Sequence, residues 1–354
     1  MNKKLIAVGI AAALAAPLAA QAGVEVYGQA RASVDFNNNG DDNPGQEKSN
    51  MSLSSNASRI GFKGDEDLGG GLTALYQFET GVSFDTGAWA TDARPSFVGL
   101  GGGFGTVVGG RLDTPYKSTT NSWDPFVDTK ADYNSIMQGA RTSNTLAYMS
   151  PDMSGFKASL AYVMPSVVTG SDSLPMTKTQ KKQSAYDLGL NYDNGPLGIA
   201  AGYEVLTKSG DTATGATEPD DATFWKVGAK YVIMDATTLA LIYENQDVGG
   251  DIKDHNNIYF AASHKIGETT LKLAYTKADK WGGVDNSGAD QISVGVSQAL
   301  TKNTEVYALY SQISNEDNGI YGLSGGPGSV AKTDGTQSDV STISIGINHS
   351  FSSK

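Results

Sequence analysis

Apolar and polar residues alternate through most of the chain, and this period-two pattern constrains the fold more than any other feature. In SRIGFKGDEDLGGGLTALYQFETG, residues 58–81, Ile60 and Phe62 alternate with Arg59 and Lys63, and a second alternating run follows an acidic, glycine-rich turn. The pattern returns in VEVYGQARASV near the N-terminus and in STISIGINHSF near the end. Such alternation is typical of β-strands with one apolar and one polar face. We therefore expect an all-β protein.

The first 22 residues form a separate unit. Two lysines precede an apolar stretch, Leu5–Ala20, and the small-x-small sequence AQA follows at its end. This order is typical of a secretory signal peptide that is cleaved on export. We therefore predict that residues 1–22 are removed and that residues 23–354 form the mature protein.

The charge and composition of the chain exclude several classes of protein. Loss of the two leader lysines leaves 24 basic against 38 acidic residues, a net charge of −14, which does not suit a nucleic-acid-binding protein. The absence of cysteine excludes a disulfide scaffold and a thiolate metal site. Beyond the leader, no apolar stretch approaches the roughly 18 residues of a membrane helix, so a bilayer could be crossed only by β-structure.

Turn signals divide the mature chain into about sixteen alternating segments of roughly 8 to 13 residues, close to the length of a tilted transmembrane strand. Tight turns alternate with long polar connections along the chain. Short turns at one end and long loops at the other are typical of an outer-membrane β-barrel. A soluble β-sandwich or propeller would also alternate, but the export signal, the strand length and the loop asymmetry favour the barrel.

Three segments resemble the general porins of proteobacterial outer membranes: SRIGFKGDEDLGGGLTALYQFETG, RPSFVGLGGGFGTVVGGRLDTPY and RTSNTLAYMSP. The resemblance is most specific from Arg59 to Tyr148 and extends in architecture over residues 23–354. It implies a 16-stranded antiparallel transmembrane β-barrel in the outer membrane of a Gram-negative bacterium. It also implies a homotrimer in contact with outer-membrane lipid and lipopolysaccharide, and a third external loop that folds into the pore.

The longest connection in the chain, residues 112–140, matches this inward loop. Loops of this length in a compact fold are usually either functional or disordered. Four aromatic residues argue against disorder because they could anchor the loop to the inner wall: Tyr116, Trp123, Phe126 and Tyr133.

The function that the resemblance implies is that of a general diffusion porin, a passive water-filled channel for ions and small hydrophilic solutes. Two alternatives are a solute-selective outer-membrane channel and a barrel that acts as an adhesin or an enzyme. An enzyme is disfavoured because none of the three histidines lies near a nucleophile in a catalytic pattern. We expect no cofactor and no metal: DFNNNGDDNPGQE begins like a calcium loop but lacks the acidic twelfth residue and the flanking helices.

All five arginines precede residue 142, although the 21 lysines are spread along the whole chain. By the resemblance, Arg59, Arg94 and Arg141 belong to strands that line the constriction opposite the inward loop. Alternation places Arg94 on the face opposite to Phe97. Arginine suits a narrow pore because its guanidinium remains charged there and keeps a fixed planar geometry.

Carboxylates of the loop are expected to face these arginines. Asp124 and Asp128, in WDPFVD, are the first candidates, and Asp113 and Asp132 are the reserves. Opposed rows of charge would create a transverse field that orients water and dipolar solutes.

Three further basic residues are possible pore-lining groups. Arg31 and Lys63 face the lumen by alternation. Arg111 ends a strand beside the loop, where a bracing role and a role in permeation are both open.

Overall fold

The computed structural model describes residues 24–38, 40, 49–167, 182–208, 221–249, 254–323 and 339–354. The predicted signal peptide, residues 1–22, lies outside the described residues, as does most of the connection that resembles a calcium loop.

Within the described residues, seventeen strand segments form one sheet. Their bounds are β1 Val24–Asn38, β2 Ser49–Ser55, β3 Arg59–Gly69, β4 Leu72–Ser83, β5 Ala88–Gly102, β6 Gly105–Asp113, β7 Arg141–Met149, β8 Phe156–Val167, β9 Lys182–Asn194, β10 Leu197–Lys208, β11 Ala222–Ile233, β12 Thr237–Asp247, β13 His255–Ile266, β14 Thr269–Ala278, β15 Ala289–Thr301, β16 Thr304–Asn315 and β17 Val340–Ser352. Three short helical pieces lie between β6 and β7: α2 Pro115–Ser118 and the 3-10 helices η1 Asn121–Trp123 and η2 Tyr133–Ser135.

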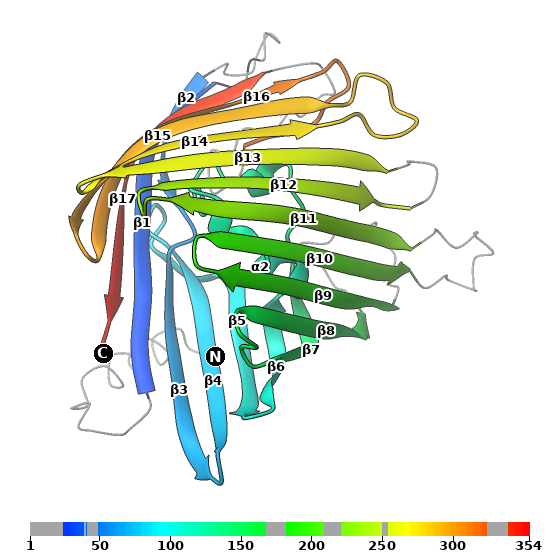
Figure 1. Cartoon of the computed structure of the whole chain (residues 1–354). Helices are drawn as coiled ribbons and strands as arrows, with labels where there is room; N and C mark the ends of the chain where they lie inside the picture. The colour runs from blue at the N-terminus through cyan, green and yellow to red at the C-terminus, as the bar shows by residue number, and fades with distance from the viewer. Residues whose placement is uncertain are drawn as a thin grey trace.

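The sheet closes into a barrel because β17 pairs antiparallel with β1 (Figure 1). Segments β2 and β3 both pair with β1, so they are two parts of one wall strand. The break between them contains Ala57, whose φ of 53° is left-handed and interrupts a regular strand. The wall therefore has sixteen strands, as expected.

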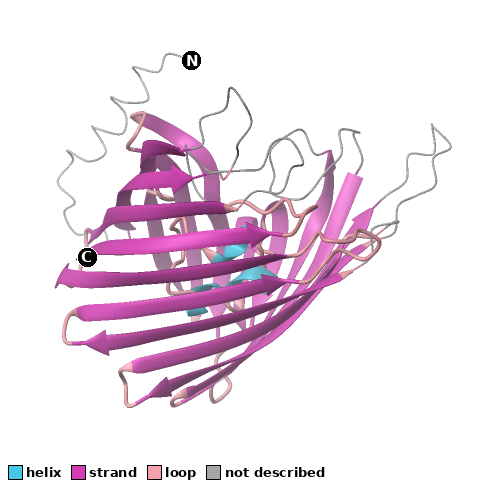
Figure 2. Ribbon diagram, turned by 90° about the horizontal axis from the view of Figure 1, so that it is seen from above, coloured by secondary structure: helices cyan, strands magenta, loops and turns pink. Residues whose placement is uncertain are grey.

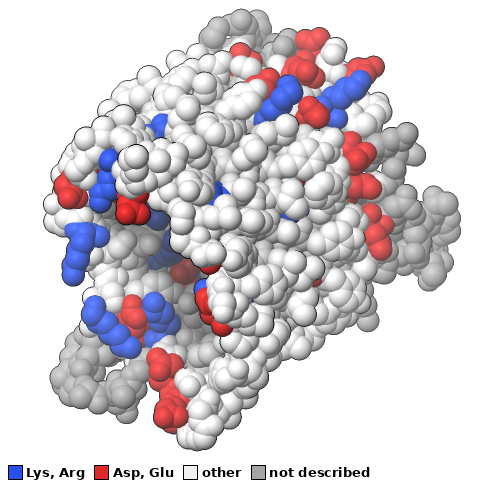
Figure 3. All heavy atoms as spheres, in the orientation of Figure 1, with Lys and Arg blue, Asp and Glu red and all other residues white. Residues whose placement is uncertain are grey.

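Side chains alternate between the outside and the inside of the wall. On β17, Ile345 is 58% exposed, whereas its neighbour Ser344 is 1% exposed. The face of the wall seen in Figure 3 is a broad uncharged band, with acidic and basic side chains gathered near the strand ends. An apolar outer band with a polar interior is the arrangement that a lipid-embedded, water-filled barrel needs.

Strand β5 departs from strict alternation. Its pairing with β4 passes from Phe78↔Ser96 to Thr80↔Ala93, so that three residue steps in β5 match two steps in β4. The extra residue is a β-bulge, and a one-residue shift reverses which side chains face inward.

The bulge turns both Arg94 and Phe97 toward the inside. Arg94 forms an ion pair with Glu79, and Phe97 packs against an inward-facing cluster that contains Val108. The expectation that Arg94 and Phe97 lie on opposite faces is therefore wrong, although Arg94 itself faces inward.

The interior of the barrel is partly filled by the connection between β6 and β7 (Figure 2). Its helical pieces have three or four residues each. No helix in the described part of the chain is long and apolar enough to cross a membrane.

Candidate constriction site

The neck of the inward loop is held by its own backbone. Thr114 N–H donates to the carbonyl of Ala140 at 3.1 Å, which brings the two ends of the loop together. Thr114 also caps α2, because its hydroxyl accepts from the N–H of Lys117, and Pro115 occupies the first turn. The sequence LDTPYK thus turns the chain sharply away from the wall and into the lumen.

Both ends of the loop bind the same wall carboxylate. The Tyr116 hydroxyl donates to Glu244 Oε1 at 2.6 Å, and the Gln138 N–H donates to the same oxygen at 3.1 Å. The Tyr116 N–H also donates to Asp187 at 2.9 Å. Glu244 on β12 and Asp187 on β9 therefore anchor the loop to one side of the barrel.

The middle of the loop packs on the same side of the wall. Its aromatic residues are buried with wall residues from β12, β13 and β16, as expected from the sequence. The cluster includes Trp123, Phe126, Tyr133, Met137, Ile242, Tyr259 and Leu309.

Asp124 belongs to this packed part of the loop. Its carboxylate accepts from the Phe126 N–H at 2.8 Å, from the Tyr133 N–H at 3.0 Å and from the Tyr259 hydroxyl at 2.8 Å. Burial and the neighbouring Asp132 carboxylate raise the pKa of Asp124 to about 7. Asp124 therefore lies between loop and wall, away from the arginines that it was expected to face.

Asp132 organises the loop from within. Its carboxylate accepts from the Asp128 N–H and the Asn134 N–H, both at 2.8 Å, and so caps η2. Burial raises the pKa of Asp132. Like Asp124, it does not lie opposite the arginines.

Asp128 is the loop carboxylate that meets the arginines. It sits at the tip of the loop with a left-handed φ of 58°, and its Oδ2 lies 2.9 Å from Arg59 and 3.1 Å from Arg31. Burial alone would raise the pKa of Asp128, but the Arg59 and Arg31 guanidiniums outweigh it and hold this pKa below its ordinary value. Arg31 also donates to the Val127 carbonyl at 3.3 Å. Three predicted site residues, Arg31, Arg59 and Asp128, therefore meet at the contact between the loop tip and the wall.

Arg94 and Arg141 bind carboxylates of the wall itself. Arg94 pairs with Glu79 on β4 at 2.5 Å and with Asp92 on its own strand at 3.4 Å. Arg141 lies 3.9 Å from the same Asp92. No role was predicted from the sequence for Glu79 or for Asp92. Asp92 lies two residues before Arg94, a spacing at which two side chains share one face of a strand.

Asp113, a reserve candidate, also lies in this second cluster. It accepts from Arg141 Nε and from Lys117 Nζ, both at 3.0 Å. Asp113 is the last residue of β6, so these two contacts fix the start of the loop beside Arg141.

The two remaining basic candidates lie apart from the loop tip. Lys63 pairs with Glu25 at 3.4 Å and lies 5.0 Å from the Tyr27 ring centroid. Arg111 donates to the Ala93 carbonyl and to the Ser143 hydroxyl, both at 2.7 Å, and so links its strand to both neighbours. These contacts favour the bracing role for Arg111.

Comparisons with known proteins agree with this architecture. Residues 7–318 match the model of the family described as Gram-negative porin. The outer membrane porin protein 32 of Delftia acidovorans is 30% identical over 99% of this chain and 100% of its own length. The major outer membrane protein P.IB of Neisseria meningitidis is 30% identical over 93% of this chain and 98% of its own length.

The solved structures show the same fold. The anion-selective porin from Comamonas acidovorans superposes with a TM-score of 0.75 at 26% identity, covering 93% of this chain and 99% of its own. The chain belongs to the Gram-negative porin family and is an outer-membrane porin, a channel and not an enzyme.

Proposed function

We propose that residues 112–140 form the size-limiting constriction of a general diffusion pore, and that Arg31, Arg59, Arg94 and Arg141 form its positive wall. The contact of Asp128 with Arg59 and Arg31 carries this proposal, because it joins the tip of the loop to the opposite wall at 2.9 and 3.1 Å. A solute that passes between loop and wall must pass these charges.

The charge arrangement at the loop tip favours anions. Two guanidiniums share the single carboxylate of Asp128, which leaves an excess of one positive charge there. Asp124 and Asp132 add little to the field in the pore because both carboxylates are buried in loop contacts. The relative from Comamonas acidovorans, described as anion-selective, points in the same direction.

We further propose that the protein assembles as a homotrimer among outer-membrane lipids and lipopolysaccharide, as is usual for porins of this family. The outer face of β1 carries Gly28, Ala30 and Ala32. The Phe351 ring covers Gly28, so the small side chains of Ala30 and Ala32 are the ones that would permit close approach of a neighbouring barrel. The mass of the detergent-solubilised complex, corrected for bound detergent, tests this: a mass of one chain would reject the trimer.

Recording from the purified protein in a planar bilayer tests the pore. We expect steady ion conductance and, under a potassium chloride gradient, a reversal potential with the sign of anion preference. A protein that inserts without steady conductance would contradict the channel. A reversal potential of the cation sign would contradict the proposed dominance of the arginine wall.

A further inference from the structure

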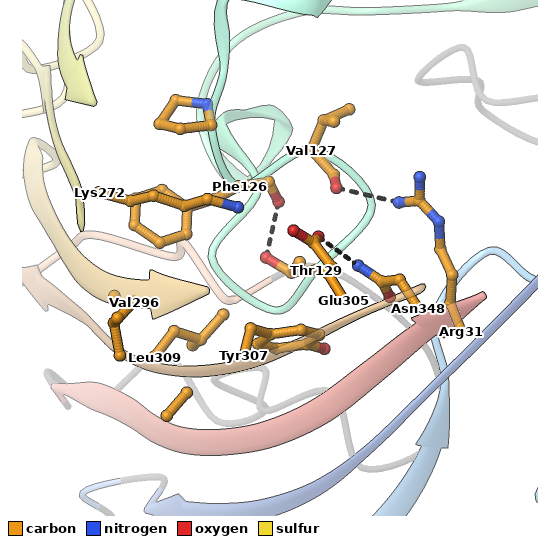
Figure 4. Close-up of a pocket in the computed structure, with 13 residues that line it drawn as sticks. Arg31, Phe126, Val127, Thr129, Lys272, Val296, Glu305, Tyr307, Leu309 and Asn348 are labelled. Atoms are coloured by element: carbon orange, nitrogen blue, oxygen red, sulfur yellow. Dashed lines mark hydrogen bonds between the residues drawn. The ribbon is translucent and has the colours of Figure 1, made fainter. Parts of the chain in front are cut away.

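A small cavity lies between the tip of the loop and the wall formed by β14 to β17 and β1 (Figure 4). Its volume is about 110 Å³, far more than the roughly 10 to 15 Å³ that one ordered water requires. It is distinct from the ion-pair clusters described above, although Arg31 contributes to its rim.

Two opposite charges face each other across this cavity. Lys272 on β14 and Glu305 on β16 extend toward one another in Figure 4. Lys272 makes no ion pair with any residue that the structure describes, and the two groups do not pair directly. Glu305 accepts from the Asn348 side chain at 2.9 Å through Oε1, which leaves Oε2 available for a second donor.

The third charge at the rim is already engaged. Arg31 donates to the Val127 carbonyl and pairs with Asp128, so its positive charge is largely balanced by the loop tip. The charges that remain open to a solute are therefore one ammonium and one carboxylate, on opposite sides of the cavity.

Apolar side chains also line the cavity. Phe126 from the loop and Leu309 from β16 line it, and Gly295 on β15 forms part of the floor. A Cβ atom at Gly295 would lie 2.9 Å from the Phe126 ring, so this glycine lets the ring pack directly on the wall. A short aliphatic group would fit beside these residues and displace water from them.

We propose that this cavity is a weak binding subsite for α-amino acids in their zwitterionic form, which rests on the proposed function of the protein as a diffusion pore. The carboxylate of the solute binds Lys272, its ammonium donates to Glu305, and its side chain lies beside Phe126 and Leu309. A simple anion would meet the Glu305 carboxylate and a simple amine would meet Lys272, so each lacks the complementary partner that the zwitterion has.

Titration of L-valine into single-channel recordings at neutral pH tests the subsite. We expect a saturable fall in ion current. Isovalerate and isobutylamine, which keep the isopropyl group of valine but carry one charge each, should block far less at equal concentration.

Two substitutions test the assigned contacts. Lys272→Met and Glu305→Gln should each raise the half-blocking concentration of valine roughly fivefold, the size expected for the loss of a partly exposed ion pair. Glu305→Gln keeps an acceptor for Asn348, so the wall should remain intact. Lys277→Met is the matched control: Lys277 lies on the same strand but pairs with Asp290 outside the cavity, and its loss should leave block unchanged.

The outcomes separate this inference from the proposed function. Steady conductance without saturable block by valine would overturn the subsite and leave the diffusion pore standing. Equal block by isovalerate would also overturn it, because Glu305 would then have no role. A protein without any conductance would contradict the pore itself.

Discussion

The two halves of the inner wall use charged residues for opposite purposes. Along β1 to β7, we propose that Arg31, Arg59, Arg94 and Arg141 line the part of the lumen that the loop leaves open; the side chains of Arg31 and Arg59 there are 15% and 16% exposed. Along β9 to β12, four ionisable residues lie under the loop and are at most 4% exposed: Asp187, Glu204, Lys226 and Glu244. Under the proposed function, the position of the loop therefore decides whether a wall charge acts on permeating ions or holds the constriction in place.

The covered half depends on the loop for its partners. A buried charge is costly unless other groups replace its water shell. Tyr116 supplies several of these contacts, since its hydroxyl donates to Glu244, its N–H donates to Asp187, and its ring lies 4.2 Å from the Lys226 ammonium. Detachment of the loop would leave these wall groups unsatisfied, so wall and loop stabilise one another.

Glu244→Ala should give the largest effect, because it removes the acceptor for both ends of the loop. The Tyr116 hydroxyl and the Gln138 N–H would lose their partner, at about 1 to 3 kcal/mol for each buried donor left unpaired. We expect the loop to detach, single-channel conductance to rise, and larger sugars to enter in a liposome-swelling assay.

Glu268→Ala is the control for this change, since Glu268 lies in a short turn far from the loop in the sequence and its backbone makes the turn contact. It should keep the size limit of the wild type. A folded Glu244→Ala barrel with an unchanged size limit would show that the covered half does not hold the constriction.

The open half should control selectivity. Arg59→Ser removes one of two positive charges at the loop tip, and Asp128→Asn removes the carboxylate that they share. A unit charge about 4 Å from a passing ion is worth about 1 kcal/mol in water, or roughly fivefold in permeability ratio at low salt. Reversal potentials should therefore move toward cations for Arg59→Ser and toward anions for Asp128→Asn. If both variants moved the ratio in the same direction, the loop tip could not be the selective site.

Much of the wall could be predicted from the sequence, because period-two alternation is a local property. The opposite exposures of Ser344 and Ile345 follow from it directly. The positions of the five arginines, all before residue 142, also indicated that these charges belong to the first strands of the barrel. Asp128 is a predicted partner for the arginines together with Asp124, and only the structure distinguishes the two.

The exact partners could not be predicted, because they depend on backbone turns that alternation does not reveal. Asp124 binds the N–H two residues ahead, and Asp132 does the same, so each carboxylate is taken up by its own loop. Aspartate is common in turns because its carboxylate accepts from the backbone N–H two residues later. This preference could have identified Asp124 and Asp132 as structural residues. The β5 bulge, which turns Arg94 and Phe97 to the same face, has no comparable signal apart from Pro95.

At lower pH, the loop should bind more tightly to the half of the wall that it covers. The pKa of Asp124 rises from an ordinary 3.8 to about 7 on burial, so the docked loop binds a proton more tightly than a detached loop does. Docking is therefore strongest below about pH 4 and weakens as the pH rises through about 7. We expect fewer closing events and less open-channel noise at pH 5 than at pH 8.

Asp124→Asn should reduce this pH dependence because it removes the titrating carboxyl group. The Phe126 and Tyr133 N–H groups donate to different oxygens of Asp124, so the amide keeps an acceptor for only one of them. Its permeability ratio should stay close to the wild type, in contrast to Asp128→Asn. A large selectivity change in Asp124→Asn would mean that this carboxylate acts on the pore in spite of its burial.

The smallest effect on selectivity is expected from Lys226→Met, and this prediction tests the comparison most directly. Lys226 is a basic residue on the inner wall, as Arg59 is, but it is fully buried against Tyr116. Methionine keeps most of the side-chain volume and the contact with the ring. The reversal potential should change by much less than in Arg59→Ser, while unfolding by heat should occur at a lower temperature because Glu244 and Glu204 lose a nearby positive charge. A shift in selectivity equal to that of Arg59→Ser would show that charges in the covered half of the wall also act on permeating ions. The proposed difference between the two halves would then be wrong.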